Sequence, residues 1–208
     1  MPLSQSTFST LLQGAPLIAI LRGMAPQETA RAASLLWESG VRLVEIPLHS
    51  PTSHDAFRET LLAKADYTEA TLGMGSIRTT DDYRFAQDVG ADFTVSPGLF
   101  PKICRESLSD KMAHLPGVFS PTEVGHAMEL GFAEVKLFPA SVYGPAGLAK
   151  ILDPFPTARI VAVGGVDKTN CHQFISQGAF AVGMGTSLAP LFGSMSDFLG
   201  SLSQPQPK

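Results

Sequence analysis

Two charged residues stand inside runs of apolar residues, where charged side chains are seldom found. Lys136 lies in the run EVKLFP between Val135 and Leu137, and Glu45 lies in the run LVEIPL. Both runs have the length and the composition of short buried strands. A lysine in such a strand either reaches the strand end or is desolvated, and desolvation lowers the pKa of its amine. An amine that is neutral near pH 7 can attack a carbonyl carbon to form a carbinolamine and then an imine.

Glu45 is the candidate for the proton transfers that this chemistry needs. Two isolated opposite charges in one protein interior are expected to meet, so Glu45 is expected to lie near Lys136. A carboxyl group beside Lys136 can move protons during carbinolamine formation, loss of water, carbon–carbon cleavage and hydrolysis. The alternative is that the lysine is structural and pairs with a carboxylate across the interior. Since a buried ion pair contributes little to stability, the joint presence of both charges favours catalysis.

Further candidates lie where other apolar runs end. Arg22 ends the run PLIAILRG and offers a fork of N–H donors that suits a substrate carboxylate, although a rim arginine that only faces water is the alternative. Two glycine-rich turns, VAVGGVDKTN and AVGMGTSLAP, each precede a helix-like segment. Backbone N–H groups at such turns bind anions, and two of them together favour a phosphorylated substrate over glycines that serve only tight turns. The candidate anion ligands are Gly164, Gly165, Gly183, Gly185, Thr186 and Ser187.

A repeated unit supplies the elements that must position these residues. A helix-like stretch, a glycine and a short apolar run that ends near proline or glycine recur along the chain. The runs are continuously apolar, as in parallel strands that are covered on both faces. This alternation predicts an α/β fold, a single (β/α)8 TIM barrel, rather than an open doubly wound sheet. The eight predicted strands are PLIAILRG, VRLVEIP, TEATLGMGS, ADFTVSP, HLPGVFS, FAEVKLFP, ARIVAVGGV and AFAVGMG.

The domain prediction follows from the length of 208 residues, which is near the lower limit for this barrel. We expect one domain over residues 1–208, with the barrel core at 16–188 and a frayed, proline-rich tail at 201–208. Catalytic groups of such barrels lie at the C-terminal ends of the strands, and the last two strand-to-helix turns are the recurrent phosphate site. Further strand-end candidates are His49, Ser76, Ser96 and Ser120.

The composition excludes several classes of function. With 16% charged residues and a formal charge of -4, no basic stripe exists for nucleic acid. The longest apolar runs are too short to span a bilayer, and the N-terminus lacks the pattern of an export signal, so a cytoplasmic location is expected. Cys104 and Cys171 do not have the spacing of a zinc site, and the histidines are scattered. We therefore expect no metal, and His49 would be the first candidate ligand if one were required.

From about Pro16 to Leu188 the sequence resembles the family of 2-keto-3-deoxy-6-phosphogluconate and 2-keto-3-deoxy-6-phosphogalactonate aldolases. The motifs PLIAILRG, VEIPLHSP, GMGS, PTE, VKLFPAS, VAVGGV and GMGTSL stand in the family's order and spacing. The resemblance implies a class I aldolase that releases pyruvate, works without a cofactor and forms a homotrimer. It implies that Lys136 is the Schiff-base lysine and that Glu45 carries protons. The implied substrate ligands are Arg22 and Ser76 for the pyruvate end and Gly165, Gly185 and Thr186 for the phosphate.

The two branches of the family differ in the configuration of the substrate at C4. VEIPLHSP and Val163 before Gly164-Gly165 are similar to the galactonate branch, whereas SPG at 96–98 and PGVFSPTE are similar to the gluconate branch. The gluconate branch tends to have threonine in place of Val163. An apolar Val163 leaves the substrate hydroxyl unpaired there, so we expect the galactonate compound to be preferred. The alternative is a 2-keto-3-deoxy-6-phosphogluconate or 4-hydroxy-2-oxoglutarate aldolase.

Three departures from the family pattern bear on specificity. His49 replaces an asparagine and either tunes Glu45 or fills space, Ser76 replaces a threonine, and Met74 replaces a small residue and is expected to crowd the barrel interior. Two rival functions are a sugar-phosphate isomerase or epimerase and a non-catalytic sensor of phosphorylated sugar acids. Both would use the glycine turns, but neither needs Lys136 together with Glu45.

Overall fold

Eight continuously apolar stretches of the sequence form nine parallel strands, because one stretch is divided by a proline. The computed structural model describes residues 8–12, 15–185, 188 and 193–203. All eight predicted strands are confirmed. The strands are β1 (Leu17–Ile20), β2 (Leu43–Pro47), β3 (Thr71–Gly75), β4 (Phe93–Val95), β5 (Ala113–Leu115), β6 (Gly117–Val118), β7 (Glu134–Leu137), β8 (Arg159–Val163) and β9 (Ala181–Met184).

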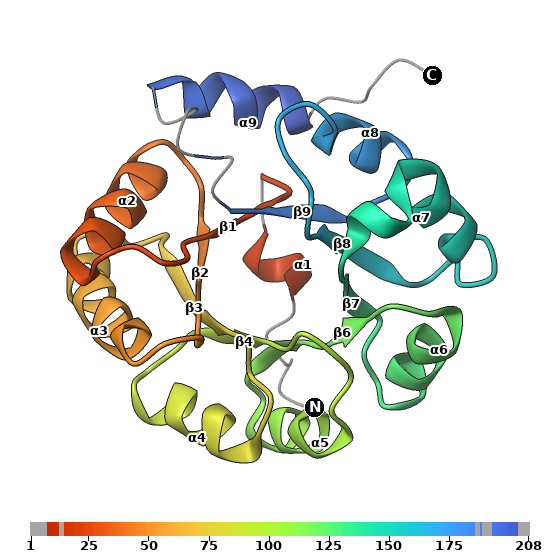
Figure 1. Cartoon of the computed structure of the whole chain (residues 1–208), viewed down its shortest axis with the longest axis horizontal. Helices are drawn as coiled ribbons and strands as arrows, with labels where there is room; N and C mark the ends of the chain where they lie inside the picture. The colour runs from red at the N-terminus through yellow and green to blue at the C-terminus, as the bar shows by residue number, and fades with distance from the viewer. Residues whose placement is uncertain (1–7, 13–14, 186–187, 189–192, 204–208) are drawn as a thin grey trace.

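The strands form a barrel, as the sequence predicted (Figure 1). The sheet order is β5-β4-β3-β2-β1-β9-β8-β7-β6, and its two outer members, β5 and β6, follow one another in the chain on either side of Pro116. Proline lacks the N–H that a continuous ladder requires. Its carbonyl still accepts a hydrogen bond from the Lys136 N–H at 2.9 Å. β5 and β6 together therefore take one strand position, which gives the eight positions of a (β/α)8 barrel.

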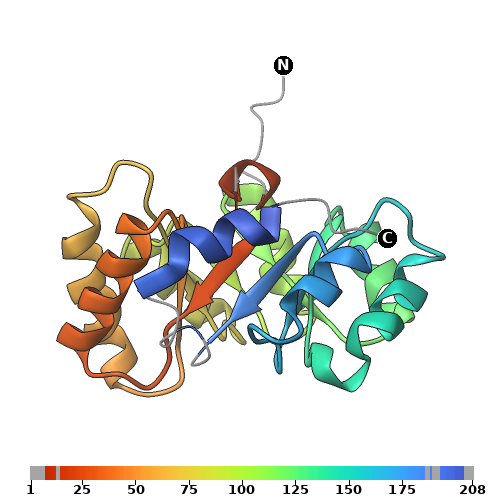
Figure 2. The same ribbon diagram turned by 90° about the horizontal axis from the view of Figure 1, so that it is seen from above.

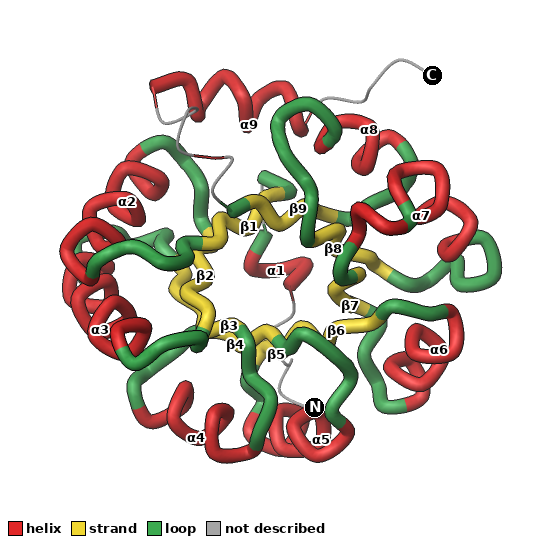
Figure 3. The backbone as a smooth tube through the Cα atoms, in the orientation of Figure 1, coloured by secondary structure: helices red, strands yellow, loops and turns green. Residues whose placement is uncertain are grey.

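The helices from α2 to α9 surround this ring of strands, and α1 lies over its centre (Figure 3). None in the described part of the chain is long and apolar enough to cross a membrane. Residues 201–203, which we expected to begin a frayed tail, form the end of α9, and 204–208 lie outside the described residues. The helices are α1 (Phe8–Leu11), α2 (Pro26–Glu38), α3 (Thr52–Lys64), α4 (Thr80–Asp88), α5 (Pro101–Asp110), α6 (Pro121–Glu129), η1 (Ala140–Val142), α7 (Gly144–Leu152), α8 (Cys171–Ser176) and α9 (Met195–Ser203).

The side chains of each strand alternate between the barrel lumen and the layer beneath the helices. In β2, Leu43 belongs to the lumen cluster, whereas Val44 and Ile46 pack toward the helices. α1 lies across the amino-terminal end of the strands (Figure 2). It places Phe8 edge-on against Phe93 of β4, with ring centroids 5.2 Å apart. The lumen is therefore covered at its amino-terminal end, and a site within the lumen is expected at the carboxyl ends of the strands.

His114 occupies the outer layer between β5 and the helices. It is 3% exposed, its Nδ1 lies 2.9 Å from the Thr94 hydroxyl, and its Nε2 lies 3.3 Å from the Ser96 hydroxyl. Burial lowers the pKa of His114 to about 3. Histidine in the unfolded chain binds a proton near pH 6.5, so between pH 6.5 and 3 the unfolded state binds more protons than the folded state. The contribution of neutral His114 to stability is complete above pH 6.5 and is lost progressively below it.

We expect the free energy of unfolding to decrease more steeply in the wild type than in a His114→Gln variant when the pH is lowered. Lowering the pH from 7.5 to 5.0 should remove roughly 2 kcal/mol more from the wild type, because each pH unit below 6.5 contributes about 1.4 kcal/mol. Urea unfolding of both proteins at both pH values measures this difference. Equal losses in the two proteins would show that His114 does not titrate upon unfolding.

Candidate active site

Glu45 lies in the lumen near the carboxyl end of β2. It is 2% exposed, and its register partners are Ile20 of β1 and Gly73 of β3. Its carboxyl group occupies the space beside Gly75, where a Cβ would lie 1.3 Å from Oε1 and 2.4 Å from the carboxyl carbon. The absence of a side chain at position 75 is therefore what makes room for the Glu45 carboxyl group. Sequence reasoning did not single out Gly75, although the motif GMGS contains it.

Lys136 enters the lumen from β7 and is 6% exposed. Its Nζ lies 4.8 Å from the centroid of the Phe138 ring, an interaction in which the ring face attracts the ammonium group. Phe138 directly follows β7, two residues after Lys136, and so faces the same side of the sheet. We did not single out Phe138 from the sequence, where it reads as one more apolar residue of the strand.

Lys136 and Glu45 act on one another electrostatically across the lumen. Burial lowers the pKa of the Lys136 amine, and the charge of Arg22 lowers it further, while Glu45 opposes both effects. Burial raises the pKa of Glu45, against the charges of Lys136 and Arg22. Both groups are thus shifted toward their neutral forms. Among the described residues Lys136 and Glu45 form no salt bridge within 4.0 Å, so the alternative of a structural ion pair between them is not supported.

A pocket lies at the carboxyl ends of β1, β8 and β9, and although neither Lys136 nor Glu45 lines it, Phe138 connects it to Lys136. Its volume is about 330 Å³, and its walls include Phe138 and Arg22. Arg22 is exposed at the rim, in agreement with its predicted position after β1. A larger hollow of about 480 Å³, which includes Trp37 and Tyr67, lies before β2 and β3 and so at the other end of the barrel. The remaining walls of the smaller pocket are formed by Ile20, Val163, Gly164, Gly165, Val166, Asp167, Gly183 and Gly185.

The predicted glycine turns form part of the wall of the pocket. Gly164 and Gly165 have φ angles of 89° and 74°, a region that favours glycine. Within the described residues, the N–H groups of Gly164, Gly165 and Gly185 donate to no protein acceptor. Unpaired backbone donors that line a pocket are suited to an anion. Thr186 and Ser187, the hydroxyl residues predicted for this site, lie outside the described residues.

Val163 and Ser76 complete the predicted set. Val163, at the end of β8, is 5% exposed and packs so close to Gly183 that a Cβ there would lie 2.8 Å from Val163 Cγ2. Ser76 directly follows β3 and has a φ of 60°, a conformation that costs a non-glycine residue about 1 kcal/mol or more. Strained residues of this kind concentrate at functional sites. Ser76 does not line the pocket, so its predicted contact with substrate stays a prediction.

Four other candidates have different surroundings from those expected. Met74 does not crowd the lumen: it is fully buried toward the helices, because Gly73 and Gly75 take the lumen-facing positions of β3. Ser96 is a partner of His114 in the outer layer. Ser120 caps α6 and accepts from the Glu123 N–H at 3.3 Å. His49 is exposed outside the pocket, and its Nδ1 lies 2.9 Å from the Pro47 carbonyl.

A metal centre is not supported by the side chains that the structure describes. No group of three or more histidine, cysteine, aspartate or glutamate residues is placed to hold a metal ion in that part of the chain. His49, the first candidate ligand, has no such neighbours among these residues.

Replacing Gly75 with alanine is expected to impair catalysis while leaving the fold intact. The new methyl group would displace the Glu45 carboxyl group, and a shift of about 1 Å in a catalytic group can cost about 100-fold in rate. Turnover with any accepted keto acid measures the loss, and circular dichroism checks the fold. Gly125→Ala is the matched control, because an added Cβ on α6 only reaches ordinary contact with Phe155 at 3.8 Å. Similar activity in both variants would show that the position of Glu45 is not limiting.

Comparisons of the sequence with family models and with known proteins identify the same family. The family model "KDPG and KHG aldolase" matches residues 8–195. The chain is 40% identical over 176 residues to a probable 2-dehydro-3-deoxy-6-phosphogalactonate aldolase of Rhizobium meliloti (strain 1021), covering 83% of this chain and 81% of the relative. It is 31% identical over 174 residues to the 2-dehydro-3-deoxy-6-phosphogalactonate aldolase of Escherichia coli (strain K12), covering 83% and 84%.

Solved structures show the same likeness. A crystal structure of a 4-hydroxy-2-oxoglutarate aldolase/2-deydro-3-deoxyphosphogluconate aldolase superposes with a TM-score of 0.83 at 27% identity, covering 93% of this chain and 98% of that one. A structure described as native KDPGal superposes with a TM-score of 0.77 at 29% identity, covering 90% and 92%. The similarity therefore extends over the whole barrel and includes both branches that the sequence motifs resemble.

Proposed function

The chain belongs to the KDPG and KHG aldolase family, and on that premise we propose that it cleaves 2-keto-3-deoxy-6-phosphogalactonate to pyruvate and glyceraldehyde 3-phosphate through a Schiff base on Lys136. As an aldolase it is a carbon–carbon lyase, which excludes the isomerase and the sensor as alternatives. The observation that carries the proposal is a buried lysine with a lowered pKa that shares the lumen with a buried carboxyl group.

The first half of the proposed reaction forms the imine. The neutral Lys136 amine attacks the C2 carbonyl carbon of the keto acid, and the carbonyl oxygen takes up a proton to give a carbinolamine. Glu45, whose pKa is raised by burial, is protonated over a wider pH range than an exposed glutamate and so can supply that proton. Loss of water then leaves a protonated imine. The Phe138 ring, 4.8 Å from Nζ, favours the positive charge of this intermediate.

The second half breaks the carbon–carbon bond. Glu45, now a carboxylate, accepts the proton of the C4 hydroxyl, directly or through one water, while the C3–C4 electrons move into the iminium. The aldehyde leaves and an enamine of pyruvate remains on Lys136. Protonation at C3 and hydrolysis release pyruvate and restore the amine. Arg22, exposed at the pocket rim, is suited to the substrate carboxylate, and the N–H groups of Gly165 and Gly185 are suited to the phosphate.

A second candidate function within the family is cleavage of 2-keto-3-deoxy-6-phosphogluconate or 4-hydroxy-2-oxoglutarate. This function is favoured by the structural similarity to an aldolase whose name includes both activities. Val163 favours the galactonate compound instead. It lines the pocket with an apolar side chain, and a substrate hydroxyl placed against it would have no hydrogen-bond partner.

The two epimers distinguish these functions. We expect the wild type to prefer or readily accept the phosphogalactonate compound, and Val163→Thr to shift the ratio of kcat/KM toward the phosphogluconate compound. A hydroxyl contact of this kind is worth roughly 1 to 3 kcal/mol, or about five- to a hundred-fold in that ratio. Cleavage assays with both epimers measure it. A wild type that strongly prefers phosphogluconate would support the second candidate, and an unchanged ratio in the variant would show that Val163 is not the selector.

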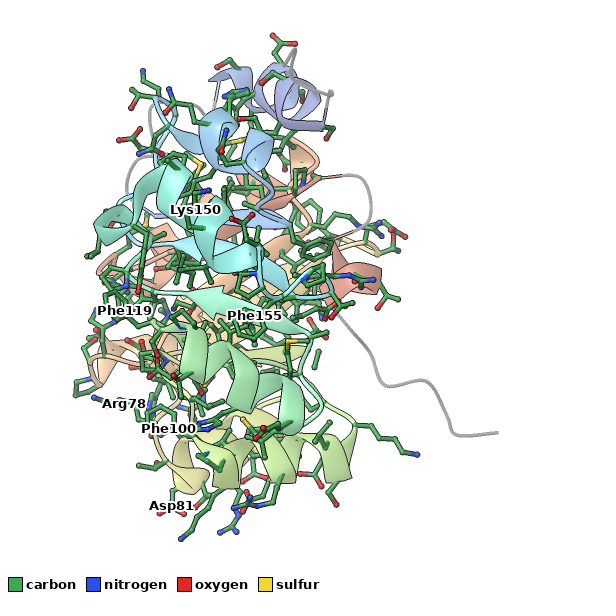
Figure 4. All side chains as sticks on the ribbon, turned by 90° about the vertical axis from the view of Figure 1, so that its right-hand side faces the viewer. Arg78, Asp81, Phe100, Phe119, Lys150 and Phe155 are labelled. Carbon is green, nitrogen blue, oxygen red and sulfur yellow. The ribbon has the colours of Figure 1, made fainter. Side chains whose placement is uncertain are left out.

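We also propose that the protein is a homotrimer, as the family resemblance implies. Exposed apolar side chains at the same end of the barrel as the pocket support a subunit interface. Phe119 is 40% exposed and Val142 is 65% exposed, and the Phe119 ring lies 5.1 Å from that of Tyr143. Figure 4 labels Phe119 toward the left edge of the molecule. The cytoplasmic location expected from the sequence stays a prediction.

A further inference from the structure

The turn that follows β8 is held in place from both sides. Ser141 donates its backbone N–H to the Gly164 carbonyl at 3.0 Å, and Asn170 donates its side-chain Nδ2–H to the Gly165 carbonyl at 2.9 Å. These two bonds fix the peptide planes before and after Gly165. In a trans peptide the N–H points away from the carbonyl. With the Gly164 carbonyl turned toward Ser141, the Gly165 N–H is turned the other way, and it has no protein acceptor among the described residues.

Glycine needs such support because it has more backbone freedom than any other residue. Both positions have little tolerance for a side chain: a Cβ on Gly164 would lie 3.0 Å from the Phe138 ring, and one on Gly165 would lie 2.5 Å from Ser141 Cβ. The turn therefore requires two successive glycines with positive φ, and the unsupported turn would populate many other conformations. An anion that binds there would then bear the cost of ordering the loop.

The Asn170 side chain is suited to this support because an amide both donates and accepts. Its Nδ2 holds the Gly165 carbonyl, while its Oδ1 accepts from the Asp167 N–H at 3.0 Å. One half-buried side chain thus bridges the backbone on both sides of Val166. An aspartate at this position would keep the acceptor and lose the donor.

We propose that Asn170 is a positioning residue: it fixes the peptide plane after Gly165, while the Ser141 bond fixes the plane before it, so that the Gly165 N–H is held ready for the phosphate. Asn170 thereby sets the preference for phosphorylated over unphosphorylated keto acids. This inference rests on the proposed function, in which the Gly165 turn binds the phosphate. Asn170 itself does not line the pocket, so it acts through the backbone of the turn. Its loss should weaken phosphate recognition without affecting imine formation on Lys136, which lies on another strand.

The test compares Asn170→Ala and Asn170→Asp with the wild type, using the phosphorylated keto acid and its unphosphorylated counterpart. For both variants we expect kcat/KM with the phosphorylated compound to fall about 10- to 100-fold, mainly through KM, because one supporting hydrogen bond and the order of the turn are lost. With the unphosphorylated compound kcat/KM should stay within about twofold. The yield of pyruvate trapped on the enzyme by borohydride should not change.

Gln173→Ala is the matched control, since it removes an exposed amide from α8 near the same loop. It should behave as the wild type with both compounds. An equal loss with both compounds in the Asn170 variants, or no loss with either, would overturn the role of Asn170 while leaving the phosphate site intact. A wild type without preference for the phosphorylated compound would instead overturn the phosphate site of the proposed function, and the role of Asn170 with it.

Discussion

Replacing Lys136 with methionine is expected to abolish aldol cleavage and to preserve the fold. Methionine keeps an unbranched apolar side chain of similar length, which suits a residue that is 6% exposed in the lumen, and it deletes the nucleophile. Removing a covalent nucleophile lowers kcat on the order of 10⁶-fold, or roughly 8 kcal/mol of transition-state stabilisation. A coupled assay for pyruvate release measures the loss, and thermal unfolding checks the fold.

Lys150→Met is the matched control for this variant. Lys150 lies on α7 with an 83% exposed side chain, and Figure 4 labels it on the outer surface of the barrel. Its only ion pair among the described residues is with Asp153, one turn along, and exposed pairs of this kind contribute little to stability. The control should retain full activity. Substantial cleavage by Lys136→Met would end the assignment of a Schiff base to this residue.

Replacing Glu45 with glutamine is expected to lower kcat about 10²- to 10⁴-fold, the usual contribution of a positioned proton carrier. Glutamine keeps the size of the side chain beside Gly75 but cannot exchange a proton with the reacting groups. The negative charge of Glu45 raises the pKa of Lys136, so its removal should lower that pKa further and keep the amine neutral. The amine should therefore still react with pyruvate, but more slowly, because Glu45 also supplies the proton for carbinolamine formation, and turnover should fall as well.

The pH dependence separates this role from a structural one. In the wild type the activity should change where Glu45 titrates, above the ordinary range of a glutamate because burial raises its pKa. That change should be absent in Glu45→Gln. Glu38→Gln, which loses a carboxylate at the exposed end of α2, is the control and should keep both the activity and the pH profile. An unchanged profile in Glu45→Gln would show that another group carries the protons.

The sequence predicts the barrel because its signals are local and repeated. Gly40, Gly90, Gly131 and Gly178 were recognisable as helix ends, and all four have φ between 81° and 99°. The apolar runs that follow them were recognisable as strands for the same reason. The interruption at Pro116 is visible in the sequence, but whether it ends the strand or only divides it depends on the pairing with β4 and β7.

The site was only partly predictable, because its geometry depends on which face of each strand is turned inward. Lys136 and Glu45 were found as charges inside apolar runs, but the distance between them depends on the barrel and not on either strand. Met74 was placed on the wrong face because the motif GMGS alone does not show that the glycines take the lumen side. The contact of Asn170 with Gly165 spans five residues of irregular backbone, which no periodicity reveals.

Reduction of the enzyme with borohydride in the presence of pyruvate tests the central claim most directly. The imine that forms between the Lys136 amine and the C2 carbon of pyruvate would be reduced to a stable secondary amine, and peptide mass mapping would locate the added mass. The account predicts complete loss of activity with one modified residue, Lys136, and no modification of Lys136→Met. Modification at any other lysine, or full activity after treatment with pyruvate and borohydride, would contradict it.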